Sequence, residues 1–344
     1  MKVLLVSERS AGHVYPALAI GEKIKENNSI DSKIIFFTSS KFFKKYIKNK
    51  GYLVLGLAFG FRNIFVEFFF RFIESLYILI KIFPDVVIGF GGRDSLFLVL
   101  FARMLGKKTY IYEPNAEMGR ANKFLSLFVK NVLRGISPSD QKKKYKIVGI
   151  PLGKNIIKKE KKRLREKFNF DQKPILLCFG GSQGSRFIND SFLNFVKKHN
   201  NNSYQIIHIT GKKDYSKVID FYKTIKNNRV IKDFCQDMSN FYNLADIILS
   251  RSGALTLAEI SFYNIPAILI PHPQAFGHQK TNANYLKNKD AALVFEQEKF
   301  NFKEFEICLN KLIQNDKVRK NMKKNFKKTK IGIKYEDFSF DFIN

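Results

Sequence analysis

The sequence has few of the residues on which small secreted proteins and zinc proteins depend. In 344 residues there are three cysteines and no tryptophan. The cysteines, Cys178, Cys235 and Cys308, lie far apart and show no paired CxxC spacing. This excludes a disulfide framework and a zinc site built on cysteine pairs. The cysteine usage fits a reducing compartment.

Acidic residues and long apolar runs are also scarce. Asp and Glu number 30 against 60 Lys and Arg, so the net charge is +30. Such a charge favours nucleic acid, anionic lipid or phosphorylated substrates as partners. The alternative is a compositional drift toward Lys, Asn, Ile and Phe over every surface. No run of about 18 uncharged apolar residues is present to span a membrane, and the apolar run before Glu8 is too short for a signal peptide. We expect a cytoplasmic protein with at most peripheral membrane contact.

What the chain does contain is an alternation of short apolar strands and helical segments. The predicted strands are Lys2–Val6, Ile34–Thr38, Val86–Gly89 and Thr109–Tyr112, and then Pro174–Phe179, Tyr204–Thr210, Ile247–Leu249 and Ala267–Ile270. Helices are predicted from about Pro16 to Lys25, over Lys41–Lys50, from about Ser185, and over Asp316–Lys330. This alternation indicates βαβ units and parallel sheets.

The strand pattern stops and restarts, which predicts two α/β domains of the Rossmann type. We expect an N-terminal domain over 1–153, a C-terminal domain over 154–330, and a tail, 331–344, that packs back on the N-terminal domain. The boundary lies near Gly149–Lys173, where Lys158–Lys167 resembles a charged helical linker. Ligands of such sheets bind outside the carboxyl ends of the strands. Two such domains facing each other would form a cleft there.

The glycine-rich segment Gly180–Arg186 follows one predicted strand directly. Glycines let backbone N–H groups approach a phosphate, and the N-terminus of the next helix adds a favourable dipole. Ser182 is a candidate to donate its hydroxyl to a pyrophosphate. The Walker pattern GxxxxGK[ST] is absent, and a glycine turn alone is often only structural.

A second strand-to-helix turn lies in Arg251–Glu259. Ser252, Gly253 and Ala254 offer further N–H donors to a phosphate. Glu259 falls one to two turns into the predicted helix, where it is a candidate to accept the hydroxyls of a ribose, as the acidic residue of dinucleotide folds does. The alternative is a solvent-facing helical glutamate.

Two more polar segments follow predicted strands. Pro271–Ala283 contains Gln279, whose amide suits sugar hydroxyls because it both donates and accepts hydrogen bonds. Gly12–Pro16 contains His13, a candidate general base near neutral pH. For a single histidine the alternative is a structural role.

The segment Phe59–Phe83 is rich in aromatic residues but too charged to span a bilayer. Its charged residues are Arg62, Glu67, Arg71, Glu74 and Lys81. Such a segment can lie in the interface of an anionic membrane, with aromatics in the acyl boundary and basic residues at the headgroups. The alternative is an ordinary core helix, since the chain has 36 phenylalanines.

Taken in order, several segments resemble the motifs of the MurG family, whose members make lipid II in peptidoglycan synthesis. They are Gly12–Ala19, Gly89–Gly92, Glu113–Ala116, Gly119–Lys123, Gly180–Arg186 with Asn189, Arg251–Glu259, and His278–Gln279 with Asn282–Ala283. The resemblance spans nearly the whole chain. It implies the GT-B fold and the inverting transfer of N-acetylglucosamine from UDP-GlcNAc to a polyprenyl-pyrophosphate-linked muramyl-pentapeptide, at the cytoplasmic face of the plasma membrane.

The resemblance also implies roles for individual residues. His13 would deprotonate the attacking hydroxyl. Ser182 would contact the pyrophosphate, Glu259 the ribose, and Cys235 the uracil through its backbone. The full donor-binding set would be Ser10, Ala11, Gly12, Asn115, Ser182, Cys235, Ala254, Leu255, Thr256, Glu259 and Gln279. No Asp-x-Asp motif occurs, so neither a metal nor a cofactor is expected.

The chain departs from the family pattern mainly in its N-terminal half. Glu8–Ala11 replaces a glycine-rich stretch and brings a carboxylate, and Arg93-Asp94 follows Gly91-Gly92 where the family usually has Tyr-Val. Gly153 stands where the family has an arginine. The acceptor-side candidates are Arg9, Gly91, Gly92 and Arg93, with the two arginines expected to meet the lipid pyrophosphate.

Three alternatives stay open at this point. One is another GT-B transferase with a different lipid acceptor. The second is a non-catalytic, basic binder of membrane or nucleic acid, although no nucleic-acid-binding motif occurs and we expect no nucleic-acid partner. The third is an inactive descendant that still binds UDP-GlcNAc.

Overall fold

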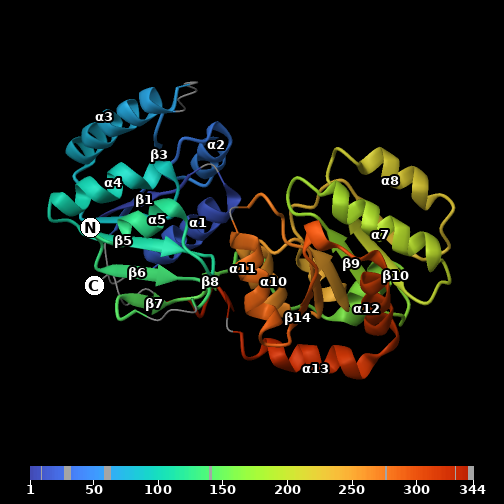
Figure 1. Cartoon of the computed structure of the whole chain (residues 1–344). Helices are drawn as coiled ribbons and strands as arrows, with labels where there is room; N and C mark the ends of the chain where they lie inside the picture. The colour runs from blue at the N-terminus through green and yellow to red at the C-terminus, as the bar shows by residue number, and fades with distance from the viewer. Residues whose placement is uncertain are drawn as a thin grey trace. The chain divides into compact units, whose positions relative to one another are not determined.

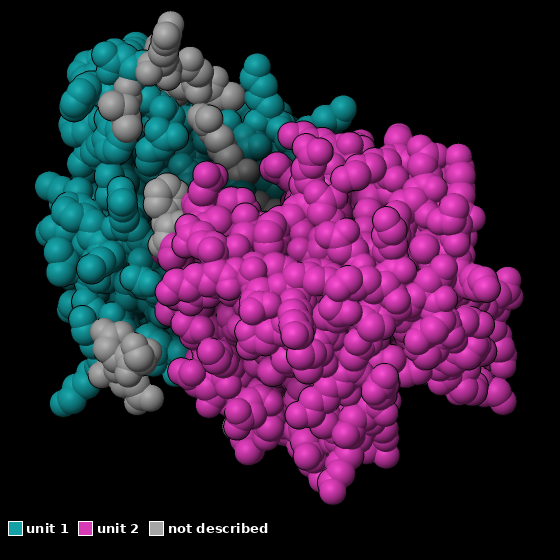
Figure 2. Space-filling model, turned by 45° about the vertical axis from the view of Figure 1, so that its right-hand side comes forward, with its two compact units in different colours: residues 1–153, 333–344 teal, residues 154–332 magenta. Residues whose placement is uncertain are grey.

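The computed structural model describes residues 1–8, 10–26, 32–57, 63–138, 142–275, 277–329 and 331–339. It divides into two compact units, Met1–Gly153 with Ile333–Asn344, and Lys154–Gly332 (Figure 2). Each unit contains one parallel sheet with helices between its strands (Figure 1). The predicted fold class, two parallel-sheet α/β domains, is confirmed.

The sheet of unit 1 has seven strands in the order β3-β2-β1-β4-β5-β6-β7, and all neighbours are parallel. The strands are β1 (Lys2–Val6), β2 (Lys33–Phe37), β3 (Leu53–Leu55), β4 (Val86–Gly89), β5 (Lys108–Glu113), β6 (Asn131–Arg134) and β7 (Tyr145–Ile147). The order reverses between β1 and β4. This reversal is the topological switch point at which ligands of such sheets bind.

Helices cover both faces of this sheet, because alternate strand residues point to opposite faces. Val3 and Leu5 belong to one core cluster with residues of α1 (Ala11–Glu26) and α2 (Lys41–Asn49). Leu4 and Val6 belong to a second cluster with residues of α3 (Ile64–Ile82) and α4 (Arg93–Met104). The short helix α5 (Arg120–Leu125) packs beside α4.

The sheet of unit 2 has six parallel strands in the order β11-β10-β9-β12-β13-β14. The strands are β9 (Ile175–Phe179), β10 (Gln205–Ile209), β11 (Arg229–Lys232), β12 (Ile247–Ser250), β13 (Ala267–Leu269) and β14 (Ala292–Val294). The helices are α6 (Lys161–Lys167), α7 (Arg186–Lys198), α8 (Tyr215–Tyr222), α9 (Ser239–Leu244), α10 (Ala254–Tyr263), α11 (His278–Lys287), α12 (Phe302–Gln314) and α13 (Asp316–Phe326). Here the order reverses between β9 and β12.

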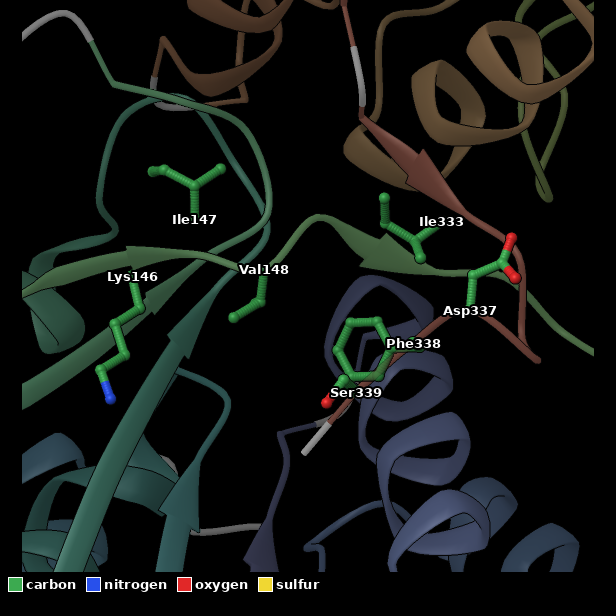
Figure 3. A pocket seen from close by; sticks show the side chains of 7 residues that line it. All are labelled: Lys146, Ile147, Val148, Ile333, Asp337, Phe338 and Ser339. Atoms are coloured by element: carbon green, nitrogen blue, oxygen red, sulfur yellow. The ribbon is translucent and has the colours of Figure 1, made fainter. Parts of the chain in front are cut away.

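The C-terminal residues from Ile333 onward belong to unit 1. Leu152 N donates to Ile333 O at 3.0 Å, where β8 (Ile150–Pro151) and β15 (Gly332–Ile333) form a two-stranded sheet. Phe338 is buried in the α1-side core cluster. A pocket of about 450 Å³ lies beside this tail (Figure 3). Its lining residues, from Lys146–Val148 and the tail, include none of the predicted site residues.

Several local predictions were wrong. Helix α1 begins at Ala11 rather than near Pro16, because Ser10 O accepts from both His13 N and Val14 N at 3.1 Å. His13 therefore lies in the first turn of a helix, not in a loop. The segment 158–167 is not an interdomain linker, since Arg165 Nη2 donates to Asp246 Oδ2 within unit 2. The terminal Lys-rich helix ends at Phe326.

Candidate functional site

The switch point of unit 1 brings His13 and the Gly91-Gly92 turn together. Gly91 follows β4 with φ +91°, a backbone conformation that favours glycine. A Cβ on Gly91 would lie 3.4 Å from His13 Nε2 and 3.3 Å from Asn122 Nδ2. The imidazole of His13 therefore packs directly against this turn. Ser95 Oγ also holds the turn, since its hydroxyl lies within hydrogen-bond distance of Gly91 O (2.9 Å) and Val6 O (3.2 Å).

Glu8 and Arg93, which both depart from the family pattern, contact each other. Glu8 Oε1 accepts from Arg93 N at 3.2 Å and lies 3.7 Å from Arg93 Nε. Arg93 Nη1 also pairs with Glu67 Oε2 at 3.0 Å. The Arg93 guanidinium is therefore already held by two carboxylates, which would compete with the predicted contact to a pyrophosphate. Arg9, which was predicted to contact the same pyrophosphate, lies outside the described residues.

Asn115 lies in a loop that the buried carboxylate of Glu113 organises. Glu113 Oε1 accepts from Asn115 N (3.1 Å) and Asn115 Nδ2 (2.8 Å), and Glu113 Oε2 accepts from Gly119 N and Asn122 Nδ2, both at 3.0 Å. The Asn115 amide thus points to its own loop in this structure. Ser10 and Gly12 lie at the start of α1, whereas the Ala11 side chain lies outside the described residues.

The switch point of unit 2 brings together the two glycine-containing turns predicted to hold phosphate. The first, Gly180–Gly184, follows β9 and leads into α7, whose first turn Ser185 caps. Gly184 has φ +77°, and a Cβ there would collide with Thr210 O. Only glycine suits this position. Ser182, at the tip of the turn, is exposed.

The second turn ends at the N-terminus of α10. The first bond of this helix runs from Leu257 N to Gly253 O, so the N–H groups of Ala254, Leu255 and Thr256 have no partner within it. No described side chain caps this end. Such N–H groups and the helix dipole favour an anion. Ala254–Thr256 therefore lie at a helix N-terminus with N–H groups free of helical bonds, and their contact with a phosphate stays a prediction.

Arg251 joins the two turns, although the sequence analysis gave it no role. Its Nη2 donates to Ser185 Oγ and Gln297 Oε1 at 2.8 Å, and its Nη1 donates to Ile270 O (3.0 Å) and Pro271 O (3.1 Å). These acceptors are all neutral. Burial lowers the pKa of Arg251 to about 10, so the side chain stays charged at neutral pH. A buried cation with no carboxylate partner among the described residues makes this end of the sheet attractive to an anion.

Glu259 is half-buried, so its interpretation as a solvent-facing glutamate is wrong. Its Oε2 accepts a 2.6 Å hydrogen bond from the Tyr242 hydroxyl. No described residue bonds its Oε1. Burial raises the pKa of Glu259 to about 7, against the lowering effect of the Tyr242 bond. Tyr242 belongs to α9 and to no recognisable motif, and sequence reasoning missed it.

Gln279 uses its amide oxygen inside unit 2. Its Oε1 accepts from His272 N at 2.9 Å and from Ser252 N at 3.4 Å, and its backbone carbonyl accepts from Ser252 Oγ at 2.7 Å. It thereby joins the turn before α10 to the loop after β13. No described residue accepts from Gln279 Nε2, which is available to a ligand.

Cys235 lies in the segment before α9. Its Sγ donates to Asp237 O at 3.1 Å. Burial raises the pKa of its thiol. The thiol therefore stays neutral and hydrogen-bonds within its own loop. This is compatible with the predicted contact between the Cys235 backbone and uracil.

Comparison with known proteins finds a matching family model for each of the two units. Residues 5–134 match the glycosyltransferase family 28 N-terminal domain, and residues 175–334 match the C-terminal domain of the same family. A UDP-N-acetylglucosamine–N-acetylmuramyl-(pentapeptide) pyrophosphoryl-undecaprenol N-acetylglucosamine transferase from Thermoanaerobacter sp. (strain X514) is 32% identical over 354 residues, covering 95% of each chain. The chain belongs to the MurG family.

Other MurG-family comparisons cover the chain to the same extent. The transferase of the same name from Leuconostoc mesenteroides is 31% identical and covers 97% of this chain and 96% of its own. Among solved structures, Acinetobacter baumannii MurG superposes with a TM-score of 0.80 at 23% identity, covering 95% of this chain and 94% of that one. A UDP-GlcNAc 2-epimerase from Neisseria meningitidis shares the fold, with a TM-score of 0.66 at 13% identity over 94% of each chain. The chain is therefore a glycosyltransferase with the two-domain GT-B fold, and a purely binding function is not supported.

Proposed function

We propose that this MurG-family protein transfers N-acetylglucosamine from UDP-GlcNAc to the muramyl sugar of an undecaprenyl-pyrophosphate-linked pentapeptide, with inversion at the anomeric carbon. The observation that carries the proposal is the placement of the family motifs. The candidate phosphate turns meet at the switch point of unit 2, and His13 meets the Gly91-Gly92 turn at the switch point of unit 1. The names of the relatives supply the substrates.

In unit 2 the donor's diphosphate would lie against the turn at Ser182 and the N–H groups of Ala254–Thr256. Arg251 is the buried cation between these turns. Its charge and the two helix N-termini would stabilise the negative charge that develops on the leaving UDP. These groups supply the positive field without a metal ion or other cofactor, and we propose that none takes part.

In unit 1, His13 would act as general base. The acceptor hydroxyl oxygen attacks the anomeric carbon of GlcNAc as its proton passes to the imidazole. The bond from that carbon to the diphosphate oxygen breaks, and UDP leaves with the electron pair. Because attack comes from the face opposite UDP, the configuration inverts. The Gly91 turn holds the imidazole by close packing.

The donor half of the proposal is tested by equilibrium titration of the full-length protein. UDP-GlcNAc and UDP are expected to bind, uridine to bind much more weakly, and GDP not to compete. Weak uridine binding follows because Arg251 and the helix N-termini recognise the diphosphate. Equal affinities for uridine and UDP would contradict the phosphate site.

Gln279→Ala is expected to reduce the preference for UDP-GlcNAc over other UDP-sugars by about tenfold, the value of one hydrogen bond to a sugar hydroxyl. The ratio of kcat/KM for UDP-GlcNAc and for UDP-GalNAc measures it. Gln274→Ala, an exposed glutamine of the same loop, is the control and should leave the ratio unchanged. An unaltered ratio in Gln279→Ala would remove Gln279 from sugar recognition.

We further propose that unit 1 binds the surface of an anionic membrane through α3. This helix has charged residues on its buried side, where Arg71 Nη1 pairs with Glu74 Oε2 at 2.6 Å and Arg71 Nε lies 3.6 Å from Asp94 Oδ1. Its exposed side is apolar. The exposed fractions of Phe65, Phe69 and Ile80 are 81%, 60% and 76%. An ordinary core helix buries its apolar side and exposes its charges. In α3, Ile78 and Leu79 reach the core, but many of the apolar side chains are exposed, which favours the interfacial interpretation over that of an ordinary core helix.

The neighbouring helices also expose apolar side chains. Helix α4 packs against both α3 and α5 (Figure 1), and Met104, Leu105, Phe124 and Leu127 are all exposed at their ends. Lys81, Lys108, Lys123 and Lys130, which belong to these helices or follow them closely in the chain, are exposed. So many exposed apolar side chains on adjacent helices are typical of an interaction site, and the lysines match anionic headgroups. In the described part of the chain no helix is long and apolar enough to cross a membrane.

Phe69→Glu combined with Ile80→Glu is expected to weaken binding to phosphatidylglycerol vesicles by at least about tenfold, because each side chain loses its burial in the acyl boundary. Vesicle co-sedimentation measures it. Phe42→Glu is the matched control, since Phe42 is 71% exposed on α2, over the other face of the sheet. Equal vesicle binding by the double variant and the control would contradict the assignment of α3.

A further inference from the structure

The side chain that holds Glu259 is Tyr242, and its surroundings leave it little freedom. Tyr242 is 2% exposed. Its ring stacks on Tyr263 at a centroid distance of 5.4 Å and an interplanar angle of 18°, and meets Phe179 edge-on at 6.0 Å. A ring packed between two others cannot turn its hydroxyl elsewhere. The hydroxyl therefore points at Glu259 because the core fixes it there.

The stacked partner is itself anchored. The Tyr263 hydroxyl donates to Ile157 O at 3.0 Å and lies 3.0 Å from Ser239 Oγ. Tyr263 and Tyr242 are thus similar residues in one stack, but only Tyr242 hydrogen-bonds the carboxylate of Glu259. This difference provides a matched pair for experiment.

From this geometry we propose that Tyr242 is a positioning residue for donor binding, which holds Glu259 Oε2 so that Oε1 faces the ribose hydroxyls as an ionised acceptor. The proposal rests on the ribose role of Glu259 in the proposed function. Tyr242 acts only through Glu259.

The same contact makes donor binding depend on pH. Burial raises the pKa of Glu259 to about 7, while the bond from Tyr242 lowers it. Burial also raises the pKa of Tyr242 well above its usual range, so the phenol remains a donor. The other titratable groups around this pair are Tyr263, Cys235 and Asp237. Since an ionised carboxylate accepts hydroxyl hydrogen bonds more strongly, donor affinity should rise as the pH passes through about 7.

Removing the hydroxyl should raise the pKa of Glu259 further. Tyr242→Phe is therefore expected to move the pH midpoint of the KM for UDP-GlcNAc upward, and to raise that KM at pH 7 by about tenfold, the value of a hydrogen bond to a charged group. The value of kcat with saturating donor should change little. UDP-GlcNAc is used instead of UDP because a terminal phosphate itself titrates near pH 6.

Two further variants separate the possible outcomes. Tyr263→Phe removes a hydroxyl from the same stack and should leave the midpoint in place. Glu259→Gln should abolish the pH dependence. If Glu259→Gln abolishes it but Tyr242→Phe does not shift the midpoint, or if Tyr263→Phe shifts it equally, the role of Tyr242 is refuted. If Glu259→Gln changes neither KM nor the profile, the ribose role fails, and with it the proposed function of this site.

Discussion

Replacing His13 with alanine is expected to lower kcat by about 10²–10⁴, the usual contribution of a general base, while the KM for UDP-GlcNAc changes little. The reason is structural. His13 lies in the first turn of α1 against the Gly91 turn of unit 1, whereas the phosphate turns, Glu259 and Gln279 belong to unit 2. Losing the imidazole removes the proton acceptor and leaves the donor contacts of unit 2 intact.

Steady-state kinetics with saturating acceptor measure this effect. His199→Ala is a suitable control. His199 is a half-buried histidine at the end of α7, and its Nε2 lies 2.8 Å from Glu306 Oε1. It should leave kcat unchanged. A His13 variant with normal kcat and weaker donor binding would assign His13 to the donor site instead of to proton transfer.

Glu259→Ala is expected to raise the KM for UDP-GlcNAc by about 10²-fold, with a smaller effect on kcat. Hydrogen bonds to charged groups contribute about 1.5–3 kcal/mol each, and a tenfold change corresponds to about 1.4 kcal/mol. Two hydroxyls held by one carboxylate account for that size. The ribose is far from the bond that breaks, so its contacts stabilise the bound substrate and the transition state equally. Losing them therefore raises mainly KM.

The substrate provides the control for this variant. A 2′-deoxy donor should bind the wild-type protein more weakly, yet be affected much less than UDP-GlcNAc by Glu259→Ala. Glu306→Ala removes a surface carboxylate that pairs with Lys198 and His199, and should leave KM unchanged. An unchanged KM in Glu259→Ala would rule out the ribose contact.

The parts of the fold that the sequence predicted are those encoded locally. Short apolar runs such as Val86–Gly89 became central strands, and glycine turns marked where strands end. The edge strands β3, β7, β11 and β14 were missed because they are only three or four residues long and carry partly exposed or charged positions. The four-residue inner strand β6 was missed as well. Their pairing depends on neighbouring strands, which a local pattern does not include.

The contacts that complete the site are encoded by long-range packing. Arg251 reaches Ser185, which is 66 residues away in the chain, and Tyr242 reaches Glu259, which is 17 residues away. Neither of these separations along the chain belongs to a recognisable sequence motif. Similarly, the sequence of α3 gives its charges but not their burial, because Asp94, the partner of Arg71, comes from α4. Sequence reasoning therefore located the turns but missed the side chains that hold them.

Adding radiolabelled UDP-GlcNAc and a lipid I analogue to the purified protein in phosphatidylglycerol vesicles tests the proposed transfer most directly. We predict transfer of the label to the lipid, with release of UDP and a β-linked product. We also predict no transfer to diacylglycerol. Binding of UDP-GlcNAc without transfer to the lipid I analogue would contradict the central claim, and transfer to diacylglycerol instead would point to a different lipid acceptor.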